Sequence, residues 1–308
     1  MTGRRSDMIT VPPELAGYHV RFNGEAGGAW IEALPALAER MLDAWELRPT
    51  GPGWHGMAAL VLPVLRADGG RAALKLQPHE EENEAEPLAL RAHDGRGAVR
   101  LLEFDPGTCS MLLEWLDAER SLNDVPDSFE AAELLTGLMA RLVTTPPPPE
   151  LRRNLGDIAS AMLAQVPGAL PSLARDDQRR LLADCAAATR ELVGEPGDRL
   201  LHWDLHYENV LAPLPDGDRR EPWLAIDPKP LVGDVGFDLL PALDNRFDPA
   251  ETLRRFDLMT EVLALDRARA KGWTLARVLQ NGLWAIEDGL TEITPDQVSI
   301  AETLLTHR

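Results

Sequence analysis

One short stretch, LLHWDLHYENVLA at positions 200–212, constrains the fold of this chain more than any other. Its ends are apolar and its middle is polar, so it predicts a polar loop anchored between two buried strands. Asp204 and Asn209 lie five positions apart within that loop. A carboxylate placed there can accept a proton from a hydroxyl, and an asparagine can give a neutral oxygen to a magnesium ion.

Together with His202, these residues fit the spacing H-x-D-x-x-x-x-N of the catalytic loop in protein kinases. That chemistry requires a second carboxylate on the next pair of strands, to hold the magnesium that bridges phosphates. The run Trp223–Ile226 reads as a strand and leads into Asp227, 18 residues after Asn209. The sequence therefore predicts an oxygen-rich site suited to a hard cation and phosphate groups.

A glycine-rich loop lies far upstream, where Gly51, Gly53 and Gly56 fit G-x-G-x-x-G. A dinucleotide-binding loop needs a strand before it and a helix after it, whereas here a helical pattern precedes the loop and a strand hairpin follows. Two interpretations remain open, a plain turn and a loop that covers phosphates. Lys75 lies 19 residues after Gly56 at the end of the next strand, where a kinase-like hairpin places its lysine.

A zinc site is the rival interpretation of the catalytic stretch, because His202 and His206 are four positions apart. The pattern H-E-x-x-H is not met, and the flanks predict strand and loop instead of helix. We therefore expect His202 and His206 to be structural residues at the loop.

Periodicity divides the chain into two regions. The first 115 or so residues predict a helix near 31–45, a hairpin at 58–65 and 72–76, a helix at 88–92, and strands at 98–104 and 110–116. Helical patterns dominate the rest, except for the alternating apolar and polar runs of 200–240. The fold class expected is α+β, with a small antiparallel sheet followed by a larger helical region.

The chain has 308 residues and a formal net charge of −19. This acidity argues against nucleic acid and anionic membrane surfaces as partners, and it permits a cationic ligand. No apolar run reaches the length of a membrane span, and no signal peptide is evident. Cys109 and Cys185 are too few for a disulfide framework, so we expect a cytoplasmic protein.

The order of Lys75, an acidic segment, HWDLHYEN and IDPKP resembles the aminoglycoside phosphotransferase family, whose fold is similar to that of protein kinases. Its branch that phosphorylates streptomycin or hydroxyurea is similar over HGMAALVLPV (55–64), LALRAHDGRGAVRLLE (88–103), LLHWDLHYENVLA (200–212), DPKPLVGDVGFDLLPAL (227–243) and LWAIEDG (283–289). The resemblance implies a two-lobed fold with a nucleotide-binding lobe at 1–113, a hinge at 114–117, and a catalytic and substrate-binding lobe at 118–308.

For the nucleotide, ATP or GTP, the resemblance implies that Lys75 pairs with the α- and β-phosphates and that a glutamate on the following helix holds Lys75. Glu86 fits that position, but Pro87 follows it and disfavours helical backbone at the residue before it, so Glu82 stays the alternative. The other residues expected at the nucleotide are Glu114, Trp115 and Leu116 in the hinge, and His55 and Gly56 in the glycine-rich loop.

For the acceptor, the resemblance implies that Asp204 orients or deprotonates the substrate hydroxyl, while Asn209 and Asp227 hold Mg²⁺. Trp203 stands where the broad family usually has glycine. In this it departs from the broad family and resembles the streptomycin branch. Further expected substrate contacts are Trp203, Asp234, Glu287 and Asp288, and Asp238 is expected to brace the catalytic loop beside His202 and His206.

These expectations define a magnesium-dependent O-phosphotransferase, acting as a monomer on a small cationic antibiotic with streptomycin first among the candidates. A kinase of the same fold that acts on hydroxyurea, a sugar or another metabolite is the alternative. A binding module with a degenerate nucleotide site is the third possibility, and the complete set of Lys75, Asp204, Asn209 and Asp227 speaks against it.

Overall fold

The computed structural model describes residues 9–307 and divides them, by backbone contacts, into two compact units. Unit 1 comprises the described residues up to Gly95, together with Val99–Leu116 and Pro213–Gly217. Unit 2 comprises Arg96–Ala98, Asp117–Ala212 and the described residues from Asp218 onward. The main division thus falls between Leu116 and Asp117, and the hinge at 114–117 stays a prediction.

Unit 1 is built on a six-stranded antiparallel sheet in the order β1-β3-β4-β6-β5, with β2 paired to β3. Lys75 lies on the central strand β4 and pairs with Val61 on β3 and Met111 on β6. The strands are β1 (Arg48–Pro49), β2 (Trp54–His55), β3 (Leu60–Leu65), β4 (Arg71–Leu76), β5 (Leu101–Asp105) and β6 (Ser110–Glu114).

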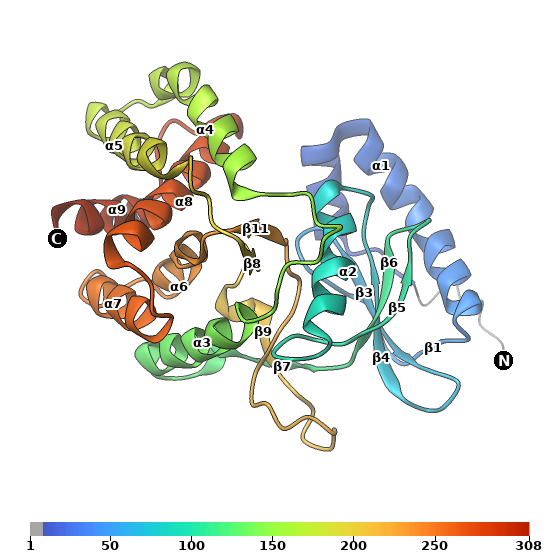
Figure 1. Cartoon of the computed structure of the whole chain (residues 1–308). Coiled ribbons are helices and arrows are strands. Elements are labelled where there is room, and N and C mark those ends of the chain that lie inside the picture. Colours follow the sequence, from blue (N-terminus) through green and yellow to red (C-terminus); the bar gives the residue numbers. More distant parts are fainter. Residues whose placement is uncertain (1–8, 308) are drawn as a thin grey trace. The chain divides into compact units, whose positions relative to one another are not determined.

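The long helix α1 (Pro13–Ala44) packs on one face of this sheet (Figure 1). Leu34 and Leu42 of α1 share a buried cluster with Leu74 and Leu76 of β4. Because side chains alternate along a strand, Lys75 points to the opposite face. The helix begins well before the predicted residue 31, and it bends at Gly24, whose φ of 53° suits glycine.

Helix α2 (Glu81–His93) completes unit 1. Periodicity predicted it over 88–92, with the acidic segment leading into it, whereas the resemblance implied a glutamate of that segment on the helix. The structure places that segment inside the helix, because Glu81, Glu82 and Glu84 occupy the first turn, where carboxylates interact favourably with the helix dipole. The early start brings Glu86 into the body of the helix.

Unit 2 contains two small sheets and most of the helices (Figure 1). One sheet has the order β10-β9-β7, and the other pairs β11 with β8. The strands are β7 (Asp117–Ser121), β8 (Arg199–Leu201), β9 (Val210–Ala212), β10 (Leu224–Ala225) and β11 (Leu231–Gly233). Strands β8 and β9 flank the stretch 202–209, as the alternation of apolar and polar runs predicted.

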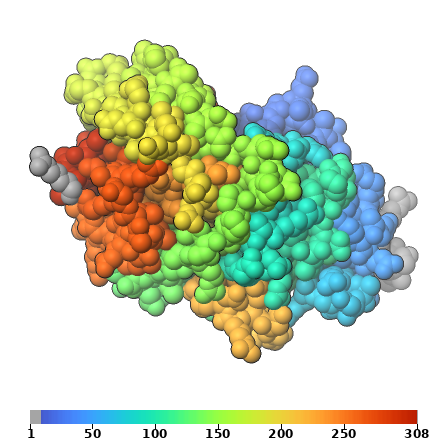
Figure 2. Space-filling view, in the orientation of Figure 1, coloured from blue at the N-terminus to red at the C-terminus, as the bar shows by residue number. Residues whose placement is uncertain are grey.

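The helices of unit 2 pack around α8, whose middle is buried from Ala270 to Gln280 almost without interruption. Figure 2 shows the surface of α4 and α5 (green to yellow) beside that of α8 and α9 (orange to red), and these helices are in contact. The helices are α3 (Ser128–Leu142), α4 (Leu155–Ala169), α5 (Asp176–Leu192), α6 (Leu240–Asp244), α7 (Thr252–Val262), α8 (Arg267–Glu287) and α9 (Pro295–Thr306). Within residues 9–307, no helix has the length and apolar character needed to cross a membrane.

Candidate active site

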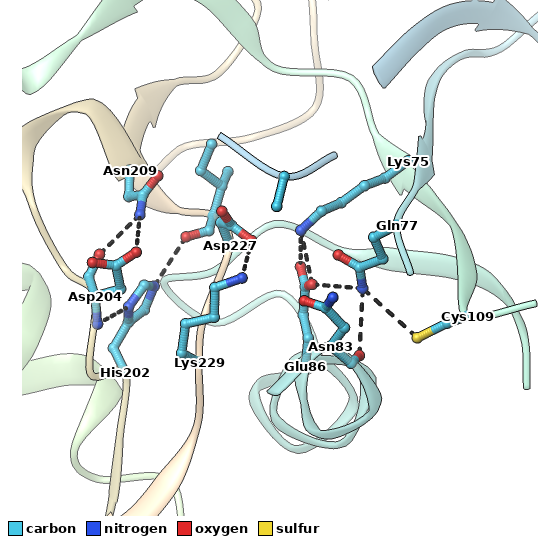
Figure 3. A network of polar contacts seen from close by, with 12 residues as sticks. Lys75, Gln77, Asn83, Glu86, Cys109, His202, Asp204, Asn209, Asp227 and Lys229 are labelled. Atoms are coloured by element: carbon cyan, nitrogen blue, oxygen red, sulfur yellow. Dashed lines mark hydrogen bonds and ion pairs between the residues drawn. The ribbon is translucent and has the colours of Figure 1, made fainter. Parts of the chain in front are cut away.

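Unit 1 contains a buried ion pair (Figure 3). The ammonium of Lys75 donates to both carboxylate oxygens of Glu86, at 2.8 Å and 2.7 Å. Lys75 is 5% exposed and Glu86 is fully buried. The structure therefore pairs Lys75 with Glu86, the residue that fitted this position in the sequence, and α2 stays helical through Glu86 although Pro87 follows.

Unit 2 contains the loop that follows β8, in which His202 joins two segments of the chain (Figure 3). Its Nε2 lies 3.0 Å from the carbonyl oxygen of Ile226, and its Nδ1 accepts from the backbone N–H of Asp204 at 3.3 Å. A carbonyl only accepts, so the proton is on Nε2 and the imidazole is neutral. The amide nitrogen of Asn209 donates to the Asp204 carbonyl at 2.8 Å and lies 3.4 Å from the Asp204 carboxylate.

Asp227 lies on the second segment, which is fastened to the loop by backbone hydrogen bonds. The N–H of Ile226 donates to the Asn209 carbonyl, and the N–H of Lys229 donates to the His202 carbonyl, both at 2.9 Å. Asp227 itself has a φ of 55°, in the left-handed region that few non-glycine residues adopt. Such backbone persists only where surrounding contacts enforce it, and it is common at functional sites. The ammonium of Lys229 lies 3.5 Å from the Asp227 carboxylate.

The side chain of Asp238 holds the same loop through hydrogen bonds from backbone N–H groups of the loop. Its carboxylate accepts the N–H of His202 at 2.8 Å and the N–H of Trp203 at 3.0 Å. Burial raises the pKa of Asp238 from 3.8 to about 6, and the two N–H groups and Arg277 oppose that rise. The loop N–H groups therefore stabilise the ionised carboxylate, and the carboxylate in turn stabilises the conformation of the loop.

Trp203 has a φ of 67° and an indole that is only 5% exposed. The guanidinium groups of Arg153 and Arg277 lie 4.5 Å and 5.3 Å from the centre of its ring system. Its Nε1–H donates to Gln280 at 3.0 Å, and its ring lies 5.9 Å from that of Trp284. These contacts fix the residue before Asp204; a contact between Trp203 and substrate stays a prediction.

The donor set fits magnesium better than zinc. With its amide nitrogen on Asp204, Asn209 offers Oδ1, and Asp227 offers a carboxylate; magnesium takes such oxygens together with water and phosphate. Both ring nitrogens of His202 are already used in hydrogen bonds, and His206 lies near Glu208 instead. Across residues 9–307, no group of three or more His, Cys, Asp or Glu side chains is arranged to hold a metal ion.

The remaining candidates of unit 1 lie at the glycine-rich loop and near β6. Trp115 lies 6.0 Å from Trp54, ring centre to ring centre, in an edge-to-face arrangement. The Glu114 carboxylate accepts the backbone N–H of Arg100 at 3.0 Å, and the His55 Nδ1–H donates to the Gly56 carbonyl at 2.9 Å. Leu116 is buried. Their contacts with a nucleotide stay predictions.

The remaining candidates of unit 2 are Asp234, Glu287 and Asp288. Asp234 accepts the N–H of Gly236 at 2.9 Å and the Nε–H of Arg269 at 2.5 Å, so its carboxylate stabilises the start of the turn that carries Asp238. Glu287 and Asp288 are exposed at the C-terminal end of α8. Contacts of these three residues with substrate stay predictions.

Four residues that contact the candidate residues within their own unit were not singled out from the sequence, namely Gln77, Arg153, Arg277 and Gln280. The three in unit 2 come from distant helices and loops, so no local pattern points to them. Gln77 carried a usable signal, since it lies two positions after Lys75 and therefore on the same face of the strand.

Comparison with known proteins identifies the family. Residues 44–289 match the profile of the aminoglycoside/hydroxyurea antibiotic resistance kinases. Streptomycin 6-kinase of Streptomyces glaucescens is 56% identical over 98% of this chain and 99% of its own length. Hydroxyurea phosphotransferase of Kitasatospora aureofaciens is 53% identical over 97% of this chain and 86% of its own.

Solved structures agree in fold. Aminoglycoside phosphotransferase APH(4)-Ia has a TM-score of 0.61 at 12% identity, covering 89% of this chain and 98% of its own. A thermostable mutant of that protein, in a ternary complex with AMP-PNP and hygromycin B, has a TM-score of 0.62 over 88% of this chain and 98% of its own, also at 12% identity. The chain therefore belongs to the aminoglycoside/hydroxyurea antibiotic resistance kinases, phosphotransferases with an alcohol group as acceptor.

Proposed function

We propose that this protein is a magnesium-dependent kinase that transfers the γ-phosphate of ATP to a hydroxyl of streptomycin or a closely related aminoglycoside. The observation that carries the proposal is the 56% identity to streptomycin 6-kinase, which extends over 98% of the chain. The hydrogen bonds that order the loop from His202 to Asn209 support the proposal.

In this proposal Asp204 receives the acceptor hydroxyl. The N–H of Asp204 donates to His202, and its carbonyl accepts from Asn209. The backbone from which the carboxylate projects is therefore held in place. Phosphoryl transfer needs little covalent chemistry from the protein, and an oriented carboxylate that takes the hydroxyl proton is the main contribution of the loop.

Lys75, Asn209 and Asp227 are the residues that we assign to the nucleotide and its metal. Lys75 would contact nucleotide phosphates, and Asn209 and Asp227 would hold Mg²⁺, which when bound neutralises charge on the phosphates. The strained backbone of Asp227 and its two neighbouring backbone hydrogen bonds support this assignment, because they fix the position of its backbone beside the loop that carries Asn209.

The cationic character of the acceptor has support in unit 2. Trp284 contacts Trp203, the neighbour of Asp204, and Glu287 and Asp288 follow one turn later at the C-terminal end of α8. Two carboxylates at the negative end of a helix dipole favour guanidinium or amine groups nearby. We propose that they contribute to binding of the antibiotic.

Hydroxyurea is the second candidate acceptor, because a hydroxyurea phosphotransferase is 53% identical over 97% of this chain. Hydroxyurea is small and uncharged, so it would gain nothing from the carboxylates of Glu287 and Asp288. Substitution of these two residues should therefore separate the candidates.

The test is a phosphate-transfer assay with magnesium and either ATP or GTP, over streptomycin, other aminoglycosides, hydroxyurea and neutral sugars. We expect streptomycin to react best with ATP, and Glu287→Gln with Asp288→Asn to raise its KM. A protein that phosphorylates hydroxyurea or a neutral sugar and leaves streptomycin unreacted would refute the proposal.

A further inference from the structure

Gln77 is a buried polar residue that directly follows β4 and contacts the Lys75–Glu86 ion pair (Figure 3). Its side chain is 1% exposed. Its amide nitrogen donates to Oε2 of Glu86 at 3.1 Å and to the backbone carbonyl of Asn83 at 3.3 Å. Both acceptors belong to α2, so one amide group connects the central strand to two points of that helix.

The bond to Asn83 replaces one that α2 cannot make for itself. In an α-helix the N–H of residue 87 would donate to the carbonyl of residue 83. Residue 87 is proline, which has no N–H, so it cannot donate this bond to the Asn83 carbonyl. The amide nitrogen of Gln77 supplies the donor and thereby stabilises the helix where Glu86 projects from it.

The bond to Glu86 bears on the ion pair itself. Oε2 of Glu86 accepts from Lys75 at 2.7 Å and from Gln77 at 3.1 Å, so two donors fix the plane of the carboxylate. Burial raises the pKa of the neighbouring Cys109 to about 11, so that thiol stays protonated near neutral pH and adds no second anion. Gln77 can hold Glu86 without adding charge to the pair, because its amide is neutral.

We propose that Gln77 is a positioning residue for nucleotide binding, which acts through Glu86 to place the ammonium of Lys75 and substitutes for the N–H that Pro87 lacks. The inference rests on the role proposed above for Lys75 toward nucleotide phosphates. Gln77 itself touches neither nucleotide nor acceptor in this scheme.

The first experiment measures the dissociation constant of AMP-PNP with magnesium by calorimetry, which requires no acceptor. Gln77→Met keeps the length of the side chain and removes the donor, and we expect it to weaken binding about tenfold. In a Glu86→Ala background, Gln77→Met should alter the dissociation constant of AMP-PNP by less than about twofold, because Gln77 acts through Glu86. An unchanged constant in Gln77→Met, or a full additional loss in the Glu86→Ala background, would overturn the proposal.

The second experiment separates positioning from helix stability. Pro87→Ala restores an N–H for the Asn83 carbonyl, so the double variant Gln77→Met/Pro87→Ala should recover thermal stability and still bind AMP-PNP about tenfold more weakly. Recovery of binding together with stability would overturn the positioning role. The double variant also keeps the question open to measurement should Gln77→Met not fold.

Gln178 provides the matched control. It is a buried glutamine of α5 that exchanges hydrogen bonds with the backbone of Ile293, so Gln178→Met should lower stability without changing AMP-PNP binding. Lys75→Ala tests the assumption beneath the proposal. Unchanged binding in Lys75→Ala would overturn the phosphate role of Lys75 and this proposal with it, whereas weakening in Lys75→Ala but not in Gln77→Met would overturn the positioning role alone.

Discussion

The free energy of unfolding should depend on pH through the buried carboxyl of Asp238, and Asp238→Asn should remove that dependence. Burial raises the pKa of Asp238 from 3.8 to about 6, against the opposing effect of the Trp203 and His202 N–H groups. The folded protein therefore binds this proton more tightly than the unfolded chain, so the free energy of unfolding falls as the pH rises from 3.8 through about 6. The full difference between the two pKa values corresponds to roughly 3 kcal/mol.

The assay is urea unfolding of the wild type and of Asp238→Asn at several pH values. All other titrating groups are common to both proteins, so they cancel in the difference. We expect the stability of the wild type relative to the variant to fall by roughly 2 kcal/mol between about pH 4.5 and about pH 7.5. A difference that stays constant over this range, or that grows with pH, would refute the reasoning.

The same substitution should reduce phosphate transfer, because the N–H groups of His202 and Trp203 lose their ionised acceptor. Asp244 offers a matched control. Burial also raises the pKa of its carboxyl, which accepts a hydrogen bond from Gln297. Asp244→Asn should change the pH dependence of stability in the same direction while phosphate transfer is unchanged.

Three further outcomes are expected. Asp204→Asn should lower the turnover number at least about 100-fold while AMP-PNP affinity, measured by calorimetry, stays close to that of the wild type; wild-type turnover would contradict its role. Asp227→Asn should abolish the dependence of nucleotide affinity on magnesium, and an unaltered magnesium titration would argue against the metal site. Gly236→Ala should lower the free energy of unfolding by about 1–3 kcal/mol, because its Cβ would lie 2.7 Å from Cα of Ala270. The matched change Gly137→Ala, on an exposed and unobstructed position of α3, should raise that free energy by up to about 1 kcal/mol, and equal effects at the two sites would contradict the packing argument.

Short-range rules were enough to predict much of this protein. The apolar ends of LLHWDLHYENVLA predicted the strands β8 and β9, and the spacing within it predicted that Asp204 and Asn209 lie together. The hairpin of β3 and β4 followed from two apolar runs around a glycine turn. Resemblance to a known family supplied the fold and the class of reaction, which the comparisons confirm.

Partner choice at the site was decided by tertiary structure. The sequence left Glu86 and Glu82 open because Pro87 disfavours helix before it. The fold pairs Lys75 with Glu86 and places the Gln77 amide where it donates to the Asn83 carbonyl, a bond that Pro87 cannot make. No pattern near Trp203 predicts that the guanidinium groups of Arg153 and Arg277 lie against its ring.

The physical reason lies in the range of the interactions. Periodicity, turns and loop spacing depend on neighbours along the chain, so the sequence by itself determines which residues form the polar loop between β8 and β9. Buried charges and unpaired backbone groups must find partners wherever the folded chain brings them, because leaving them alone in the interior is costly. Only the tertiary structure could therefore decide that Asp238 anchors the loop and that Gln77 supports the ion pair.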